Sequence, residues 1–262
     1  MNVSQHRVAE QGPAETSSAV YIQAAIATLI GMTAIIITFR TGDLIPGSAP
    51  ASMWLGLLIF TGVSGLALTR LPTYPHSQFG AANSVTMLRA AATAAIGGIV
   101  LGSDSLPTMQ QIHLQWIVVS GAAISLILDG ADGYLARRNK TESRFGARFD
   151  MEVDALLILF LAIGAALSAK AGVWVLLIGL MRYAFIIGQM TFKRLQGDLP
   201  PSMRRKIVCV VQGGALCMAL APVTPPMLGS LVLSVALVLL RYSFTVDIAY
   251  LWEPRERHCD EA

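Results

Sequence analysis

Residues 114–168 read LQWIVVSGAAISLILDGADGYLARRNKTESRFGARFDMEVDALLILFLAIGAALS. Two apolar runs flank a central part that is rich in charged residues and glycine. Each run is about 20 residues long, which is the length that an α-helix needs to cross a bilayer. The connection between them is short, so it must return the chain antiparallel. The stretch therefore predicts two transmembrane helices, at 114–135 and 147–168, whose charged ends meet near one membrane surface.

The same apolar pattern runs through the rest of the chain. Of its 262 residues, 54% are hydrophobic and only 13% are charged, and the mean hydropathy is +0.60. A soluble domain is about a quarter charged, and a disordered chain is more polar still, so both classes are excluded. No alternating strand is long enough for a barrel. Further spans are predicted at 20–39, 52–69, 85–102, 172–192, 207–223 and 227–251. We therefore predict an all-α, polytopic membrane helix bundle.

The basic residues give the orientation of this bundle. With a cytoplasmic start, the inner segments and the adjoining helix turns hold most of the 19 lysines and arginines, and only Arg40 and Lys170 lie in outer segments. The positive-inside rule then places both termini in the cytoplasm. The net charge is only +3, and we expect no nucleic-acid partner. The predicted parts are a polar cytoplasmic N-terminus (1–18), two N-terminal transmembrane helices (19–70), a six-helix membrane domain (71–251) and a cytoplasmic tail (252–262).

Four aspartates lie where the two helices of the hairpin meet. Asp129 and Asp132 are three residues apart, and Asp150 and Asp154 are four apart, so each pair shares one helix face. Two ionised carboxylates at about 4 Å repel by about 4 kcal/mol at an effective dielectric constant of about 20, so cations are needed among them. Hard oxygen ligands suit magnesium, manganese or calcium. Four carboxylates balance two divalent ions, which is the usual arrangement for phosphoryl transfer.

Small residues keep the surface beside the aspartates narrow. They are Gly133, Ala136 and Gly146. Glycine lets a ligand or a backbone approach closely. A narrow slot beside a metal pair suggests a flat base and a pyrophosphate, and Arg137 and Arg138 can then bind phosphate oxygens.

The spacing of these residues resembles the signature of the CDP-alcohol phosphotransferase family. The matching stretch is Asp129-Gly-Ala-Asp132-Gly133-Tyr-Leu-Ala136-Arg137, eight residues, Gly146, three residues, Asp150, three residues and Asp154. Every fixed position of the signature is filled. Two weaker matches are Asn83-Ser-Val-Thr86-Met-Leu-Arg89, which is similar to the start of the family's first core helix, and Lys206 followed by Gln212, which is similar to the start of its fifth. The resemblance covers about residues 80–250, a core of six spans.

The resemblance implies an enzyme that transfers a substituted phosphate from a CDP-alcohol to an acceptor hydroxyl and releases CMP. It implies that Asp129, Asp132, Asp150 and Asp154 bind two divalent cations, Mg²⁺ or Mn²⁺, and that Asp154 is also the general base. The nucleotide-binding residues would be Gly133, Ala136, Arg137 and Gly146. We expect CDP-diacylglycerol as the donor, a small polar alcohol as the acceptor, and a homodimer in a bacterial inner membrane with its active site on the cytoplasmic side.

Four basic residues are candidates for binding the acceptor. Arg182 lies inside a predicted span, where arginine is costly unless it faces a wet cavity, snorkels or has a structural partner. Arg204, Arg205 and Lys206 form a basic run that suits either anionic lipid head groups or an acceptor phosphate. They suggest a phosphorylated acceptor such as glycerol 3-phosphate or inositol phosphate. Serine, choline or a free polyol stays open, as in a phosphatidylcholine or phosphatidylserine synthase-like enzyme. The alternative to an enzyme is a non-enzymatic membrane protein, either a cation pathway or a scaffold.

Three smaller expectations concern residues outside the signature. The segment 71–80 is too polar to cross the membrane, and we expect it at the membrane interface, where Tyr74 and Phe79 are favourable. Glu152 lies on another helix face from the aspartates of its helix, and we expect it to be non-catalytic. Asp247 lies about two helical turns from Arg241 in the last span, so its partner should lie on another element.

Overall fold

The structure, a computed structural model, describes residues 18–41, 50–74, 76, 78–102, 108–139, 143–192 and 202–252. This part of the chain forms eight α-helices and two short 3₁₀ helices and contains no strand. The α-helices are α1 Ser18–Arg40, α2 Pro50–Thr69, α3 Gly80–Gly102, α4 Thr108–Asn139, α5 Arg144–Leu167, α6 Leu176–Thr191, α7 Met203–Leu220 and α8 Pro226–Trp252. The 3₁₀ helices are η1 Leu71–Thr73 and η2 Val173–Val175.

Each predicted span coincides with one of these helices, so the prediction of an all-α polytopic membrane bundle is confirmed. Six helical segments are long and apolar enough to cross a membrane by length and composition, and they belong to α1, α2, α3, α4, α6 and α8. The other two helices, α5 and α7, begin with clusters of charged residues, which lower the hydropathy of their first turns.

Several helices extend beyond their predicted ends. The first core helix, α3, begins at Gly80 rather than at residue 85, so it contains both Asn83 and Arg89. The α7 helix begins at Met203, which places the basic run in its first turn. It ends at Leu220, because the following residue precedes a proline and is therefore disfavoured in a helix. Hydropathy predicts the apolar part of a helix and misses polar turns at its ends.

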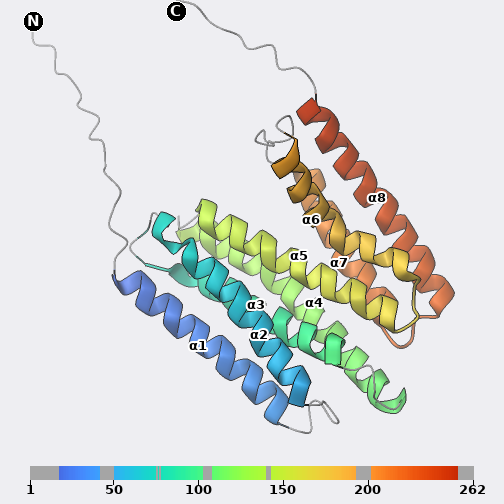
Figure 1. Ribbon diagram of the computed structural model, residues 1–262, viewed down its shortest axis with the longest axis horizontal. Helices are drawn as coiled ribbons and strands as arrows, with labels where there is room; N and C mark the ends of the chain where they lie inside the picture. The colour runs from blue at the N-terminus through green and yellow to red at the C-terminus, as the bar shows by residue number, and fades with distance from the viewer. Residues whose placement is uncertain are drawn as a thin grey trace, which may run out of the picture.

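The α3 helix lies at the centre of the molecule. It packs against α1, α2, α4 and α5. Its apolar window is 72% buried, whereas no other candidate span exceeds 33%. Figure 1 shows α1, α2 and α3 on one side and α6, α7 and α8 on the other, with α4 and α5 between them. Side chains that α3 directs toward α4 and α5 are therefore enclosed by protein.

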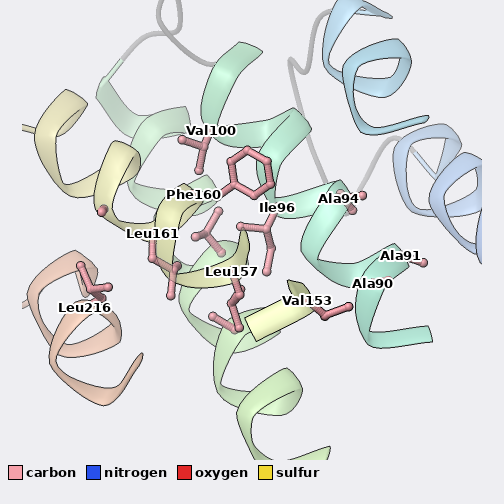
Figure 2. Packing of buried hydrophobic residues seen from close by; sticks show 14 of the residues in the cluster. Ala90, Ala91, Ala94, Ile96, Val100, Val153, Leu157, Phe160, Leu161 and Leu216 are labelled. Atoms are coloured by element: carbon pink, nitrogen blue, oxygen red, sulfur yellow. The ribbon is translucent and has the colours of Figure 1, made fainter. Parts of the chain in front are cut away.

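Small side chains on α3 allow its neighbours to approach closely. Figure 2 shows Ala90, Ala91 and Ala94 of α3 among the buried apolar residues of the bundle. A Cβ added at Gly97 would lie 2.8 Å from the ring of Phe160 on α5. Close approach through small residues is the usual way in which membrane helices pack.

The segment between α2 and α3 buries the rings of Tyr74 and Phe79 in the protein. Tyr74 is 3% exposed and Phe79 is 1% exposed. Both rings pack edge-on against Phe145 of α5, with centroid separations of 5.5 Å and 6.5 Å. The Tyr74 hydroxyl donates a hydrogen bond to the carbonyl oxygen of Phe79 at 3.2 Å, and burial raises the pKa of Tyr74. Phe145 of α5 thus offers both rings a buried aromatic partner, and the interfacial position of the segment stays a prediction.

The packing of α2 on α3 gives a test of the fold. A Cβ added at Gly98 would collide with the carbonyl oxygen of Ser52 and lie 2.9 Å from the nitrogen of Gly56. Because these atoms are backbone and cannot move alone, we expect Gly98→Ala to destabilise the protein by about 1–3 kcal/mol. The measurement is the thermal unfolding midpoint of the purified protein in detergent. The matched control is Gly62→Ala on α2, where nothing lies within 4 Å, and it should cause no loss. Equal midpoints for the two variants would contradict this packing.

Candidate active site

Three aspartates from two helices converge at one point. Carboxylate oxygens of Asp129 on α4 and of Asp150 and Asp154 on α5 all lie within 4.8 Å of one another. The spacing of four residues places Asp150 and Asp154 on one face of α5, and α4 brings Asp129 to that face. The predicted meeting of the two acidic pairs is thus seen for three of the four residues. Asp132 lies in α4, but its side chain is outside the described residues.

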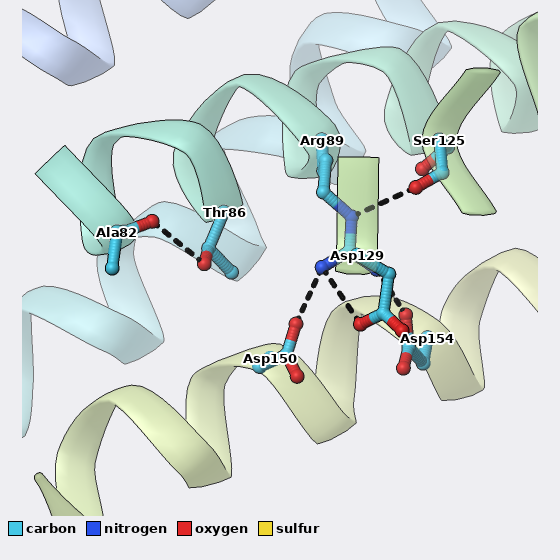
Figure 3. A network of polar contacts seen from close by, with 7 residues as sticks. All are labelled: Ala82, Thr86, Arg89, Ser125, Asp129, Asp150 and Asp154. Carbon is cyan, nitrogen blue, oxygen red and sulfur yellow. Dashed lines mark hydrogen bonds and ion pairs between the residues drawn. The ribbon is translucent and has the colours of Figure 1, made fainter. Parts of the chain in front are cut away.

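The guanidinium of Arg89 lies among the three carboxylates (Figure 3). Its Nη1 is 2.5 Å from Asp150 Oδ1 and 3.2 Å from Asp129 Oδ1, and its Nη2 donates to Asp154 Oδ1. The Arg89 side chain is completely buried, while the side chains of the three aspartates are between 17% and 32% exposed. The acidic groups are therefore paired with a buried cation on one side and remain accessible on another.

Arg89 is held in this position by α4 as well as by the acids. Its Nε donates a hydrogen bond to the carbonyl oxygen of Ser125 at 3.1 Å. A buried arginine is costly without such partners. Sequence reasoning included Arg89 only as the last residue of a weaker motif match. The signal that marks it is a positive charge within a segment that is otherwise apolar and rich in alanine.

The charge balance of the cluster suits a divalent cation. One guanidinium compensates one of the three carboxylates, so two negative charges remain uncompensated among these four groups. Carboxylate oxygens are the ligands that Mg²⁺ and Mn²⁺ prefer, and the partial exposure of the aspartates leaves them accessible. The described residues therefore fit one divalent cation. Asp132 would add a fourth carboxylate for a second cation.

The start of α5 forms the second part of the site. Ser143 caps the helix by accepting a hydrogen bond from the Gly146 nitrogen at 3.0 Å. A Cβ added at Gly146 would lie 2.8 Å from Oδ1 of Asn83 on α3, so a larger residue would displace that amide. Asn83 in turn donates a hydrogen bond from Nδ2 to the carbonyl oxygen of Phe79 at 2.6 Å. The weaker motif on α3 thus contributes to both parts of the site, because Asn83 lies at Gly146 and Arg89 lies at the aspartates.

The other residues predicted for the nucleotide slot lie in α4. Gly133, Ala136 and Arg137 belong to this helix, which continues to Asn139, but their side-chain surroundings are outside the described residues. Gly130, in the same part of α4, borders open space, since nothing lies within 4 Å of a Cβ added there. At Gly130, therefore, no described part of the protein covers the surface of α4 next to Asp129.

Arg182 of α6 lies against Glu152 of α5 rather than alone. Its Nη2 donates a hydrogen bond to Glu152 Oε1 at 2.7 Å. Its Nε and the hydroxyl of the adjacent Tyr183 are buried and have no hydrogen-bond partner among the described residues. Buried polar atoms are usually satisfied, so each of these two groups can accept a polar ligand or water as a partner. The sequence left open whether Arg182 has a structural partner or binds the acceptor. Its pairing with Glu152 is compatible with both roles.

The three residues of the basic run at the start of α7 have different surroundings. Arg204 Nη2 donates to Asp247 Oδ1 at 2.5 Å, and its Nη1 donates to the hydroxyl of Ser243 at 2.9 Å, so Arg204 ties α7 to α8. Arg205 Nη1 lies 3.6 Å from the same Asp247 oxygen. Lys206 is exposed. The expected partner of Asp247 on another element is therefore Arg204, and Arg204 is largely engaged in this contact.

Arg89 provides a test of the electrostatics of the site. Arg89→Leu removes the guanidinium and leaves three neighbouring carboxylates without a counterion, so we expect the metal-free protein to lose about 3 kcal/mol of stability. The measurement is the thermal unfolding midpoint in EDTA and again with Mg²⁺, which should restore part of the loss. Arg89→Lys, which keeps the charge but not the planar fork, should lose less. An unchanged midpoint of Arg89→Leu in EDTA would show that these ion pairs contribute nothing to stability.

Comparison with known families agrees with this geometry. The family whose sequence model matches the chain is CDP-alcohol phosphatidyltransferase, over residues 79–246. The match begins one residue before α3 and includes Arg89, the aspartates and Arg182, while α1 and α2 lie outside it. Comparisons with curated proteins and with solved structures gave no match. Since the match covers more than half of the chain, the protein belongs to the CDP-alcohol phosphatidyltransferase family.

Proposed function

We propose that the protein transfers a phosphatidyl group from CDP-diacylglycerol to the hydroxyl of a small polar acceptor and releases CMP, as a step of phospholipid biosynthesis. The observation that carries this proposal is the convergence of Asp129, Asp150 and Asp154 around Arg89 within the region that matches the family. Residues 71–251 would form the catalytic membrane domain.

Divalent cations are part of the proposal. Asp129, Asp150 and Asp154, together with Asp132 of the same motif, would hold two Mg²⁺ or Mn²⁺ ions. When bound, such ions neutralise the pyrophosphate of the donor and stabilise the CMP that leaves. Arg89 would fix the carboxylates from the buried side, because its Nε is anchored on the Ser125 carbonyl and its two terminal nitrogens contact all three acids.

Asp154 is our candidate for the general base. Its side chain is 17% exposed, against 31% for Asp150 and 32% for Asp129, so it is the most enclosed of the three. The acceptor oxygen would attack the phosphorus of the phosphatidyl group as the phosphoanhydride bond to CMP breaks, and its proton would pass to the Asp154 carboxylate. The hydrogen bond from Arg89 Nη2 holds Asp154 Oδ1, so the other carboxylate oxygen would be the one that takes the proton.

The nucleotide would lie where the end of α4 meets the start of α5. Gly133, Ala136, Arg137 and Gly146 are the residues that we assign to it. Two observations support this position: a side chain at Gly146 would displace the Asn83 amide, and Gly130 borders open space next to Asp129. A flat base and a pyrophosphate need such a narrow surface near the cations.

The acceptor would bind on the α6 side of the aspartates. Arg182 is 31% exposed and has an unsatisfied buried Nε, which favours a negatively charged acceptor such as a phosphorylated polyol. Arg205 and Lys206 would add positive charge at the start of α7, whereas the contacts of Arg204 with Asp247 and Ser243 give it a mainly structural role. A phosphate on the acceptor would give Arg182 Nε a charge-assisted hydrogen-bond partner.

The site would face the cytoplasm from a bacterial inner membrane, because the basic residues gather in the segments predicted to lie on that side. A homodimer follows from the family resemblance and is part of the proposal. A cation pathway fits less well, since the described carboxylates of the cluster lie together around a buried arginine instead of being distributed through the membrane.

The role of Asp154 can be tested by Asp154→Asn. We expect CMP release from CDP-diacylglycerol to fall below about 1% of the parent rate, because a general base contributes about 10²–10⁴-fold to a rate. Mg²⁺ binding, measured by isothermal titration calorimetry, should persist in part because Asp129 and Asp150 remain. Arg241→Gln, on the exposed surface of α8 and outside the cluster, is the control and should keep nearly the parent rate. A near-normal rate for Asp154→Asn would overturn the assignment of the base.

The acceptor can be identified by a screen with CMP release as the readout. The screen compares glycerol 3-phosphate and inositol phosphate with serine, choline and free polyols. We expect a phosphorylated acceptor to be used and Arg182→Gln to raise its KM by about tenfold or more, the cost of losing a charge-assisted hydrogen bond. Arg241→Gln, on the exposed surface of α8, should leave KM unchanged. Use of an unphosphorylated acceptor with an unaffected KM in Arg182→Gln would contradict this assignment.

A further inference from the structure

We propose that Gln23 of α1 is a positioning residue for the nucleotide slot: it holds the backbone at Phe79 and thereby keeps Asn83 in place beside Gly146. This inference rests on the proposed function, because it takes the surface at Gly146 as the place where the nucleotide binds. It assigns a supporting role to α1, which lies outside the part of the chain that matches the family.

The first observation is a hydrogen bond between distant parts of the chain. The Phe79 nitrogen donates to Oε1 of Gln23 at 2.8 Å, and the two residues are 56 positions apart. Phe79 is 1% exposed, whereas Gln23 is exposed, and without Gln23 the Phe79 N–H group would lose this acceptor. The bond thus connects α1 to the residue that directly precedes α3.

The second observation is that Phe79 is the junction between α1 and the slot. Its carbonyl oxygen accepts hydrogen bonds from Asn83 Nδ2 at 2.6 Å and from the Tyr74 hydroxyl at 3.2 Å. The next residue, Gly80, has a φ of 79°, a conformation that favours glycine, and it starts α3. The backbone on both sides of Phe79 is therefore fixed, on one side by Gln23 and on the other by the turn into α3.

The third observation connects this junction to α5. Oδ1 of Asn83 lies 2.8 Å from the position that a Cβ on Gly146 would take. The ring of Phe79 also packs on Phe145, which precedes Gly146, and Phe145 stacks on Phe149 with centroids 6.2 Å apart. A displacement of Phe79 would therefore reach Gly146 through the Asn83 amide and through the aromatic side chains.

The α1 helix is fixed firmly enough to serve as a support. Val20 and Ala24, on either side of Gln23 in the sequence, are completely buried. Further along the helix, a Cβ added at Gly31 would lie 3.3 Å from the Cβ of Ala91 on α3. The α1 helix is thus packed against the protein near Gln23 and again in its middle. This packing, and not the hydrogen bond to Phe79, keeps α1 in place.

The aspartate cluster has its own supports, so the two parts of the site can be separated experimentally. Arg89 is anchored by the Ser125 carbonyl and by the carboxylates, and none of these contacts involves Phe79 or Gln23. Loss of the Gln23 acceptor should therefore weaken nucleotide binding and leave metal binding unchanged.

The experiment compares CMP binding by the full-length protein and its variants in nanodiscs, in the presence of Mg²⁺, by isothermal titration calorimetry. In Gln23→Leu, which removes the acceptor at similar size, we expect the dissociation constant for CMP to rise about fivefold, because only about a fifth of the molecules would then hold the slot in its binding-competent form. The dissociation constant for Mg²⁺ alone should stay unchanged. Gln23→Glu keeps an acceptor oxygen and should bind CMP nearly as the parent does. The control on the same helix is Thr33→Val, because the exposed Thr33 hydroxyl bonds to the carbonyl of Leu29 within α1.

Each outcome distinguishes this inference from the proposed function. A parent protein that binds Mg²⁺ but not CMP would overturn the proposed function and, with it, this role of Gln23. If the parent binds CMP and Gln23→Leu binds it equally well, the proposed function stands and the role of Gln23 fails. If Gln23→Leu loses Mg²⁺ binding and CMP binding to the same extent, Gln23 supports the whole fold and not the slot, which also overturns the inference.

Discussion

The contact of one buried guanidinium with three carboxylates is the constraint on which the rest of the structure depends. Arg89 enters from α3, Asp129 from α4, and Asp150 and Asp154 from α5. In an apolar surrounding neither partner is tolerated without the other, so the three helices have to meet at this point. The rotation of α5 about its axis follows, because the face with the two aspartates must turn toward α3. The site is thus a consequence of charge pairing as much as of apolar packing.

The remaining helices make this meeting of charges rigid. The alanine and glycine residues of α3 let α2 and α5 approach its backbone, and α1 covers a further part of its surface. On the other side of the molecule, Arg204 and Asp247 join α7 to α8, and Glu152 and Arg182 join α5 to α6. Polar pairs therefore connect some helices, while small residues let others pack along their length. A site built in this way is held by several independent contacts.

Much of this arrangement follows from the sequence, and the exceptions have physical causes. Apolar runs of membrane-spanning length are sufficient to predict the eight helices, and helical spacing is sufficient to bring Asp129 to Asp150 and Asp154. The role of Arg89 could not be predicted in the same way, because its partners lie on other helices and no local spacing connects them. The same holds for the pairing of Arg204 with Asp247. The burial of Tyr74 and Phe79 could not be predicted either, because composition does not reveal that Phe145 offers them a buried partner.

The distance along the chain between Arg89 and its partners has a consequence for how the protein enters the membrane. Asp150 and Asp154 follow Arg89 by 61 and 65 residues, so α3 is synthesised well before the α5 carboxylates that neutralise it. The α5 helix, with its charged first turns, is in turn a poor substrate for insertion by itself. Each helix carries the charge that the other needs. Arg89 can therefore be paired with all three carboxylates only after α5 has followed α3 and α4 into the membrane.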